Sequence, residues 1–369
     1  MKFTVDRTLL SEACTNVSRA VSSKSTLPAL EGLLIHAENN LIKITGYDLE
    51  MGITTQLPAQ VSRPGSLILN ARLFCDIVRK LPEEQVMVDS DEKMMTQISS
   101  GNADFSILGI DAEEFPNLPA IENEENLLIQ SNVLAAMIRQ TVFAVAQTDV
   151  KPVLTGILFE TENQFLKMVA LDGYRLAMRK EPIEAEQKMK FIVPGKTVLE
   201  VLKLLNEEEL DIQVLVGPKH IMFKIDEYYI ISRLLDGTFI DYQSAIPSGE
   251  GTGVFVSSRA MINSVERISL LITDRLKSPV RCVFEDDMVK MSCVTTIGKA
   301  NDQLAVKMED GANIEIGFNN KYLLDALKAC EVEDIKMELS GALSPMKIMP
   351  VQGDHFLFLV LPVRLKADG

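Results

Sequence analysis

The sequence predicts an α+β protein made of three copies of one domain, each with two helices and about eight strands. A strand-like run at residues 41–44 recurs at 165–168 and 288–291, which places the copies about 124 residues apart. A helix-like run keeps the same offset at residues 69–79, 193–203 and 318–328. This period is too long for a solenoid repeat and fits a small domain.

The repeat divides the 369-residue chain into expected domains at residues 1–121, 125–247 and 253–369. Stretches rich in Pro, Gly, Asn and Glu lie between them, at 116–126 and 247–253, and such residues favour turns. A unit of roughly 120 residues can bury its own core without disulfides or metals. We therefore expect three independent cores.

Each domain is expected to open with a short strand and an amphipathic helix, at residues 9–21, 133–146 and 259–272. Asp6, Ser131 and Ser257 precede these helices, and their side-chain oxygens can accept free backbone N–H groups. Alternating apolar residues, such as Ile42 and Ile44, then indicate strands. After the second helix, further strands are expected at 86–100 and 104–108, at 212–224 and 228–233, and at 335–348 and 355–361.

Composition restricts the possible functions. Hydrophobic residues make up 47% and charged residues 24% of the chain, as in ordinary globular proteins. The formal charge of −15 argues against a protein that coats nucleic acid with its whole surface, although a local basic surface remains possible. The five cysteines show no C-x-x-C spacing and indicate reduced thiols. Without a long apolar run or a signal-peptide core, we expect a cytoplasmic location and no membrane partner.

No motif predicts a catalytic centre, a cofactor or a metal site. The run Gly195-Lys196-Thr197 resembles part of a phosphate-binding loop, but Lys190 occupies the position where that loop needs a glycine. A helix start is the favoured interpretation. The alternating glycines at 249–253 precede a strand, whereas a dinucleotide fingerprint follows one. The three histidines are scattered and share no ligand spacing.

The second helix of each copy carries two cations seven residues apart, which places them on one face. A carboxylate shares that face in each copy: Asp76, Glu200 and Asp325. Two interpretations remain open. These charged residues on one helix face form solvent-exposed ion pairs, or their cations form a basic surface that faces a polyanion. Further cations follow each first helix. The cations are Arg72 and Arg79, Lys196 and Lys203, Lys321 and Lys328, and then Lys24, Lys151, Arg275 and Lys277.

Six sequence runs carry a further signal: Met1–Val5, Thr26–Pro28, Thr45–Glu50, Phe115–Leu118, Leu171–Leu176 and Leu361–Leu365. Together with the triplication, they resemble the bacterial sliding clamp, the beta subunit of DNA polymerase III. The resemblance covers essentially the whole chain. It implies a ring of two head-to-tail copies, with helices lining a pore for duplex DNA bound without sequence preference. It also implies a homodimer that tethers the polymerase III catalytic subunit, the clamp loader, other DNA polymerases and repair proteins.

The resemblance also assigns site residues. DNA contacts are expected at Lys24, Arg72, Lys151, Lys196, Lys203, Arg275, Lys321 and Lys328. A groove for partner peptides is expected at Leu154, Leu171, Gly173, Tyr174, Arg175, Leu176, Ile240, Ala245, Val360, Leu361, Pro362, Val363 and Arg364, with the two arginines framing its polar ends. The dimer interface is expected at Phe105 and Ile107 on one side and at Leu271 and Ile272 on the other.

The chain departs from the family pattern in a few places. Ile240 replaces a common proline, and Ser244 stands where an arginine can occur. The acidic cluster that can accompany the second side of the interface is absent, because residues 299–301 read Lys-Ala-Asn. Residues 366–369 extend past the usual ending. Two other hypotheses stay open, an enzyme that uses residues 195–197 for nucleotide and an α+β scaffold that binds proteins but no DNA.

Overall fold

The computed structural model describes residues 1–22, 24–121, 124–148, 151–184, 187–205, 209–249, 251–273, 278–309 and 312–365. They form two compact units. The first contains residues 1–132 and 200–234, and the second contains residues 133–199 and 235–369. The extension at 366–369 lies outside the described residues.

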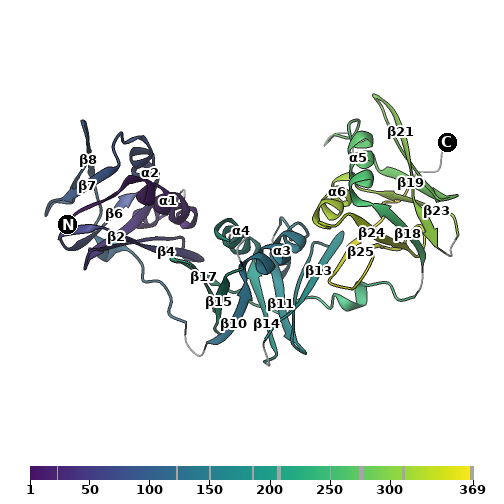
Figure 1. Ribbon diagram of the computed structural model, residues 1–369, viewed down its shortest axis with the longest axis horizontal. Coiled ribbons are helices and arrows are strands. Elements are labelled where there is room, and N and C mark those ends of the chain that lie inside the picture. The colour runs from purple at the N-terminus through teal and green to yellow at the C-terminus, as the bar shows by residue number, and fades with distance from the viewer. Residues whose placement is uncertain are drawn as a thin grey trace. The chain divides into compact units, whose positions relative to one another are not determined.

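The first unit contains a five-stranded antiparallel sheet in the order β5-β1-β7-β8-β9. Helices α1 (Arg7–Val17) and α2 (Ala71–Lys80) pack against each other beside these strands (Figure 1). The strands are β1 Lys2–Asp6, β5 Gln60–Arg63, β7 Gln85–Ser90, β8 Met95–Ser100 and β9 Ala103–Leu108.

The same unit contains an eight-stranded sheet in the order β10-β15-β16-β17-β4-β3-β2-β6. Its centre is the antiparallel pair of β17 and β4, which joins strands from the first two repeats. The strands are β2 Gly32–Glu38, β3 Leu41–Tyr47, β4 Met51–Pro58, β6 Gly65–Asn70, β10 Glu125–Gln130, β15 Asp211–Val216, β16 His220–Ile225 and β17 Tyr228–Arg233.

The second unit contains a nine-stranded sheet in the order β14-β11-β12-β13-β26-β25-β24-β18-β22. Here β13 pairs with β26 and joins strands from the second and third repeats. The strands are β11 Gly156–Glu162, β12 Phe165–Leu171, β13 Arg175–Pro182, β14 Met189–Pro194, β18 Thr252–Ser257, β22 Lys307–Glu309, β24 Asp334–Leu339, β25 Met346–Pro350 and β26 Phe356–Val360.

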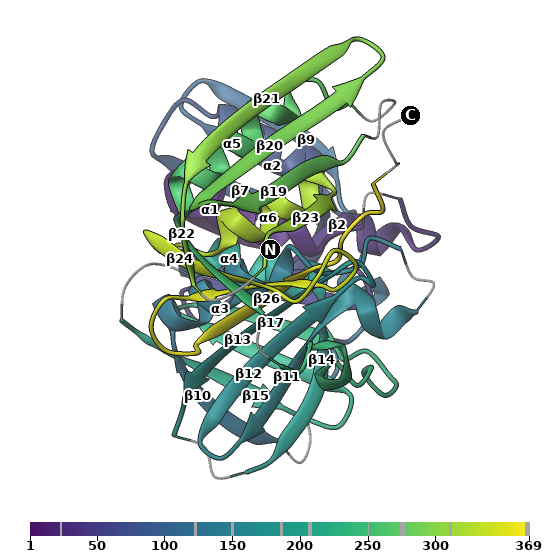
Figure 2. The same ribbon diagram turned by 90° about the vertical axis from the view of Figure 1, so that its right-hand side faces the viewer.

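A four-stranded sheet completes the second unit in the order β21-β20-β19-β23. Figure 2 shows β21 at the outer edge of this sheet. Helix α5 (Ser258–Ser269) packs on β20 and β21 and against α6 (Asn320–Ala329). The strands are β19 Val280–Glu285, β20 Met288–Thr295, β21 Gly298–Ala305 and β23 Ile314–Phe318.

The same two-sheet plan therefore occurs three times. In each repeat, one group of four paired strands contains the repeat's first strand and its last three: β1-β7-β8-β9, β10-β15-β16-β17 and β18-β24-β25-β26. The other group contains four of the strands between the two helices: β4-β3-β2-β6, β13-β12-β11-β14 and β21-β20-β19-β23. This confirms three domains of α+β type. The described residues hold nine, eight and nine strands in the three repeats, close to the expected eight.

The helices were predicted correctly in number, but the first helix of each repeat was predicted to begin one or two residues late and to end three or four residues late. Helix α1 ends at Val17, α3 spans Ser131–Val142, and α5 ends at Ser269. Apolar residues past these ends, such as Ala20 and Ala144, are still buried, so the periodicity continues where the helix does not. Asp6 and Ser257 cap their helices as expected, whereas Ser131 is itself the first helical residue.

The second helices α2, α4 (Gly195–Leu204) and α6 match the predicted runs. Asn70 and Asn319 accept backbone N–H groups at the starts of α2 and α6, which were not predicted as caps. Among the described residues, no helix has the length and apolar character needed to cross a bilayer.

Candidate functional site

The turn between β12 and β13 is built by two residues. The Asp172 carboxylate accepts the backbone N–H groups of Tyr174 and Arg175 at 2.9 and 3.0 Å, which closes a side-chain turn. Gly173 has φ +89°, a conformation that favours glycine. A Cβ added at Gly173 would meet no atom within 4 Å, so the backbone conformation, and not crowding within the chain, is the reason for glycine here.

Arg175 lies inside the protein and holds this turn to α6. Its guanidinium is bonded to Asp172 Oδ2 at 3.0 Å and to Asp325 Oδ2 at 2.5 Å, and the residue is only 6% exposed. It also lies over the ring of Tyr322 at 4.7 Å, and Tyr174 stacks on the same ring. We expected Arg175 to frame a polar end of the groove. Its burial and its two carboxylates give it a structural role, and its place in the groove stays a prediction.

Apolar walls flank this turn. Leu171 and Leu176 face each other across β12 and β13 and belong to a buried cluster with Leu154. Tyr242 and Phe239 complete the cluster from the chain that follows the second domain's last strand. Ile240 and Ala245 are exposed beside them. The predicted leucines therefore form the wall of one continuous apolar region.

Tyr242 was missed by sequence reasoning. Its hydroxyl donates to Glu160 Oε2 at 2.8 Å and ties residues 239–246 to β11. Burial, together with the hydrogen bond to Glu160, raises the pKa of Tyr242 to about 12. The sequence carries no local signal for this contact, because the partners are 82 residues apart.

The C-terminal segment lies along the other side of the turn. The Leu361 N–H donates to the Tyr174 carbonyl at 2.9 Å, and the Val363 N–H donates to the Gly317 carbonyl at 2.8 Å. Leu361 and Val363 expose 36% and 39% of their surface, whereas Val360 is fully buried. Leu361, Val363 and Tyr174 thus present adjacent apolar surface. Pro362 lies between the first two in the chain, Arg364 is exposed after them, and Val360 is buried before them.

The predicted DNA-contacting cations are accessible wherever the structure describes them. Arg275 lies outside the described residues, as does Lys277. The other seven are exposed: Lys24, Arg72, Lys151, Lys196, Lys203, Lys321 and Lys328.

Ion pairs partly match those expected on the second helices. Arg79 pairs with Asp76 at 3.2 Å on α2, and Lys203 pairs with Glu200 at 2.8 Å on α4. On α6 the expected pairing is wrong, because Asp325 receives Arg175 and Lys328 pairs with Glu266 of α5 at 2.6 Å. Exposed pairs of this kind contribute little free energy, so they leave these cations able to contact phosphate.

The run at residues 195–197 starts helix α4, as expected. A Cβ at Gly195 would lie 2.9 Å from Val145 Cγ1, so close packing requires the glycine. Thr197 is 2% exposed and is not available to a ligand. These observations remove the basis for a nucleotide loop.

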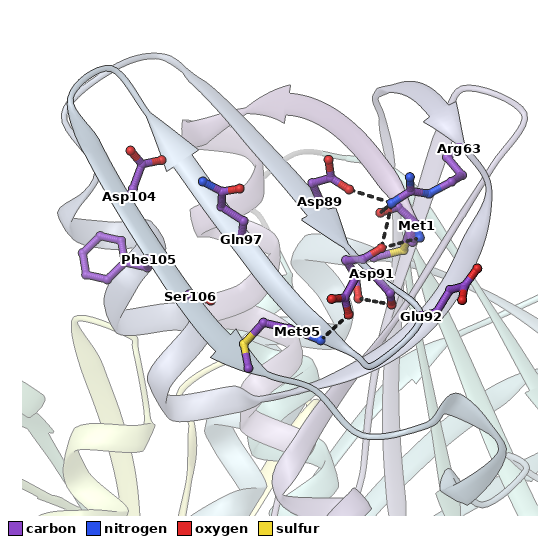
Figure 3. Close-up of a pocket in the computed structure, with 11 residues that line it drawn as sticks. Met1, Arg63, Asp89, Asp91, Glu92, Met95, Gln97, Asp104, Phe105 and Ser106 are labelled. Atoms are coloured by element: carbon purple, nitrogen blue, oxygen red, sulfur yellow. Dashed lines mark hydrogen bonds and ion pairs between the residues drawn. The ribbon is translucent and has the colours of Figure 1, made fainter.

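The predicted interface residues lie at two sheet edges. Phe105 and Ile107 are on β9, the last strand of its sheet, and Phe105 is 39% exposed. Figure 3 shows Phe105 extending outward from β9 beside a pocket lined by Asp104, Gln97 and Asp89. Leu271 and Ile272 follow α5, and Leu271 lies near Gly298 at the start of β21, the edge strand of its sheet. Exposed Leu108, Leu270 and Ile297, at 67%, 80% and 66%, belong to the same two regions and were not predicted.

Three copies of a two-sheet domain, joined through strand edges and carrying exposed cations on their second helices, define a DNA clamp, which is a processivity factor and not an enzyme. Family models for the beta subunit of DNA polymerase III match residues 1–119 (N-terminal domain), 128–241 (central domain) and 243–364 (C-terminal domain). The chain belongs to this family, the beta sliding clamps.

Individual relatives agree over the full length. The beta sliding clamp of Halalkalibacterium halodurans is 34% identical and that of Bacillus subtilis 33%, each covering 99% of this chain and 100% of the relative. The crystal structure of the Bacillus subtilis clamp superimposes with a TM-score of 0.96 at 32% identity, covering 99% of this chain and 100% of that one. A Pseudomonas aeruginosa clamp bound to griselimycin gives 0.93 at 29% identity, covering 99% and 100%.

Proposed function

We propose that two copies of this chain join head to tail into a closed ring that encircles duplex DNA in the cytoplasm. The ring tethers the polymerase III catalytic subunit, the clamp loader, other DNA polymerases and repair proteins. Its domains are bounded at residues 1–121, 125–247 and 253–369. The observation that carries this proposal is that β9 and β21, each the last strand of its sheet, lack the partner strand that their equivalents in the other repeats have.

The two edges are the repeat equivalents of strands that are already paired. Strand β17 of the second repeat pairs with β4 of the first, and β26 of the third pairs with β13 of the second. The corresponding strands left over are β9 in the first repeat and β21 in the third. Pairing β9 of one copy with β21 of another would form a third junction of the same kind. A ring of two copies would contain two such junctions.

The side chains on β9 support this pairing. Ile230 and Phe358, on the equivalent strands, are fully buried where two domains join. Phe105 holds the same place and is 39% exposed. An exposed apolar edge strand is a template for pairing with another chain. A second copy would cover it.

Retention on DNA then follows from closure and not from tight contact. Exposed cations on α2, α4 and α6 supply phosphate contacts, which position DNA without reading its sequence. Such contacts weaken with salt. The clamp should therefore stay on circular duplex DNA at a salt concentration at which it slides off a linear duplex of equal length.

The DNA proposal is tested by loading the clamp on nicked circular DNA and then cutting the circle once. We expect retention before the cut and loss after it, measured by gel filtration of labelled protein. Equal retention on the circle and the cut DNA would contradict encirclement, and loss from both would contradict closure of the ring.

The apolar region around residues 171–176 is proposed to take the peptide segments of partners. Tyr174, Leu361 and Val363 are its exposed apolar positions, and Leu154, Leu171 and Leu176 form the buried wall. A peptide with a glutamine and two apolar anchors should bind at about micromolar strength, because few residues are buried and the peptide must be ordered.

Fluorescence anisotropy of a labelled peptide tests this site. The substitutions Leu361→Asp and Val363→Asp should each reduce affinity at least about tenfold, since they place a charge at an apolar contact. The matched control is Val351→Asp, which changes an exposed apolar residue elsewhere in the third domain. Unchanged affinity in both groove variants, with the fold intact, would place the peptide site elsewhere.

A further inference from the structure

The three repeats indicate the register in which strands β9 and β21 of two copies can pair. Cross-strand pairs trace one row through the first sheet of each domain, buried except at Phe105, and each row begins four residues before the first helix. The rows are Phe3–Val88–Ile98–Phe105, Leu127–Val214–Phe223–Ile230 and Val254–Met337–Ile348–Phe358. Phe105, Ile230 and Phe358 therefore occupy one equivalent place.

A second set of rows runs through the other sheet of each domain. Each begins three residues before the second helix. The rows are Ile68–Leu34–Thr45–Thr54, Ile192–Leu158–Val169–Met178 and Gly317–Arg281–Ser292–Asn301. Thr54, Met178 and Asn301 are therefore equivalent on the other side of the junction.

Both existing junctions use the same register. Thr54 pairs with Tyr229, and Met178 pairs with Leu357, the residues just before Ile230 and Phe358. The matching residue on β9 is Asp104. Applied to the free edges, this antiparallel register sets Asp104 opposite Asn301 of a second copy, Phe105 opposite Ala300, and Ser106 opposite Lys299.

The faces of the two strands agree with this register. Phe105 is paired with buried Ile98, and Ala300 alternates with Lys299 and Asn301, which are exposed. Asp302, two residues beyond Ala300, is bonded to Ser264 and Arg267 of α5, so Ala300 lies on the helix-covered side, as Phe105 does. Asp104 and Ser106 then share the outer face with Lys299, because side chains alternate along a strand.

The charges on that outer face are complementary. Lys299 sits opposite Ser106 and diagonal to Asp104, a separation that a lysine side chain spans. Within the described residues, neither Asp104 nor Lys299 has an ion-pair partner. Asp89, farther into the same pocket, is already paired with Lys2 and Arg63 at 2.9 and 2.6 Å, and its hydrogen bond from Lys2 lowers the pKa of Asp89. Asp104 is therefore the unpaired acid nearest the edge (Figure 3).

We propose that β9 of one copy and β21 of a second copy pair in this register. An ion pair between Asp104 and the second copy's Lys299 then stabilises each of these two strand junctions, called seams below. This rests on the head-to-tail ring proposed above. It assigns the acid to the first domain and the lysine to the third, so the seam has a charge pairing of its own although the acidic cluster on the third domain is absent.

A charge swap tests the pairing, with the dimer dissociation constant measured by sedimentation. Lys299→Glu and Asp104→Lys should each weaken the dimer about tenfold, since both seams then oppose like charges. The double variant Asp104→Lys with Lys299→Glu should return to within about threefold of the original, because the pair is restored with its signs exchanged. Lys43→Glu, an exposed lysine on the interior strand β3, is the matched control and should leave the constant unchanged.

Engineered disulfides test the register separately. Ser106→Cys with Lys299→Cys should cross-link the dimer, whereas Ser106→Cys with Asn301→Cys, shifted by two residues, should not. A preferred cross-link in the shifted pair, or independent effects of the two charge variants, would overturn this proposal.

The variant Phe105→Asp separates this proposal from the ring itself. If Phe105→Asp dissociates the dimer while the charge variants show no coupling, the ring stands and the register fails. If Phe105→Asp leaves the dimer intact, the head-to-tail edge itself is wrong. Circular dichroism of each variant confirms that the chain is folded.

Discussion

At the residue scale, Arg175 has a structural role in addition to the groove role that the resemblance implies. It is bound by two carboxylates and lies against Tyr322, so it fixes the turn that carries Gly173 and Tyr174. The Asp172 half of this arrangement is local and visible in the sequence. The Asp325 half comes from a helix 150 residues away, which no local pattern can indicate.

Removal of the Arg175 guanidinium should destabilise the protein. Arg175→Ala leaves Asp172 and Asp325 without their partner, and breaking a largely buried pair costs about 3 kcal/mol. Arg175→Lys should recover only part of this, because lysine lacks the planar fork that reaches two carboxylates. Urea unfolding measures the change. A loss below about 0.5 kcal/mol for Arg175→Ala would show that the ion pairs contribute nothing net.

Substitutions at Gly173 separate two causes of lost stability, the strain of a positive φ and the steric clash of an added side chain. Because its Cβ position is open, Gly173→Asn should be nearly neutral, whereas Gly173→Val should lose about 1–3 kcal/mol of stability through its positive φ. Thermal unfolding of both variants checks this. Equal stabilities for Asn and Val would mean that the turn changes its conformation to suit the side chain.

At the element scale, the helices and strands with periodic apolar residues could be predicted from the sequence, whereas the helix ends and the pairing of distant strands could not. The caps Asp6 and Ser257, the second helices and the strand runs follow from local chemistry and were found. The ends of α1, α3 and α5 were not, because buried residues such as Val145 continue the apolar pattern in a turn. The free edges were not visible either, since the pairing of β4 with β17 and of β13 with β26 depends on residues far apart in the sequence.

The second helices make a prediction about salt. Arg72 on α2 and Lys321 on α6 are exposed and have no acidic partner among the described residues. Each of Arg72→Ala and Lys321→Ala should lower the slope of log affinity against log salt by about one unit. The matched control is Lys307→Ala, an exposed lysine on β22. A change in sequence preference, measured with duplexes of different composition, would contradict contact with phosphate alone.

At the scale of the whole molecule, the threefold repeat accounts for both the fold and the charge. A chain of −15 can surround DNA because each second helix carries exposed cations that can contact phosphate. Six similar domains in two copies can close a ring through one kind of junction used repeatedly. The family resemblance implies the ring from the sequence, whereas the terminal strands β9 and β21 that would close it are visible only in the fold.

The native mass of the particle in solution tests the central claim most directly. Sedimentation at low micromolar concentration should give twice the chain mass for the unmodified protein. It should give the single chain mass for the double variant Leu271→Asp with Ile272→Asp, because two carboxylates would be buried beside β21 without partners. Lys43→Glu should remain a dimer. An unmodified protein that sediments as a monomer, or a folded double variant that stays dimeric, would contradict the head-to-tail ring.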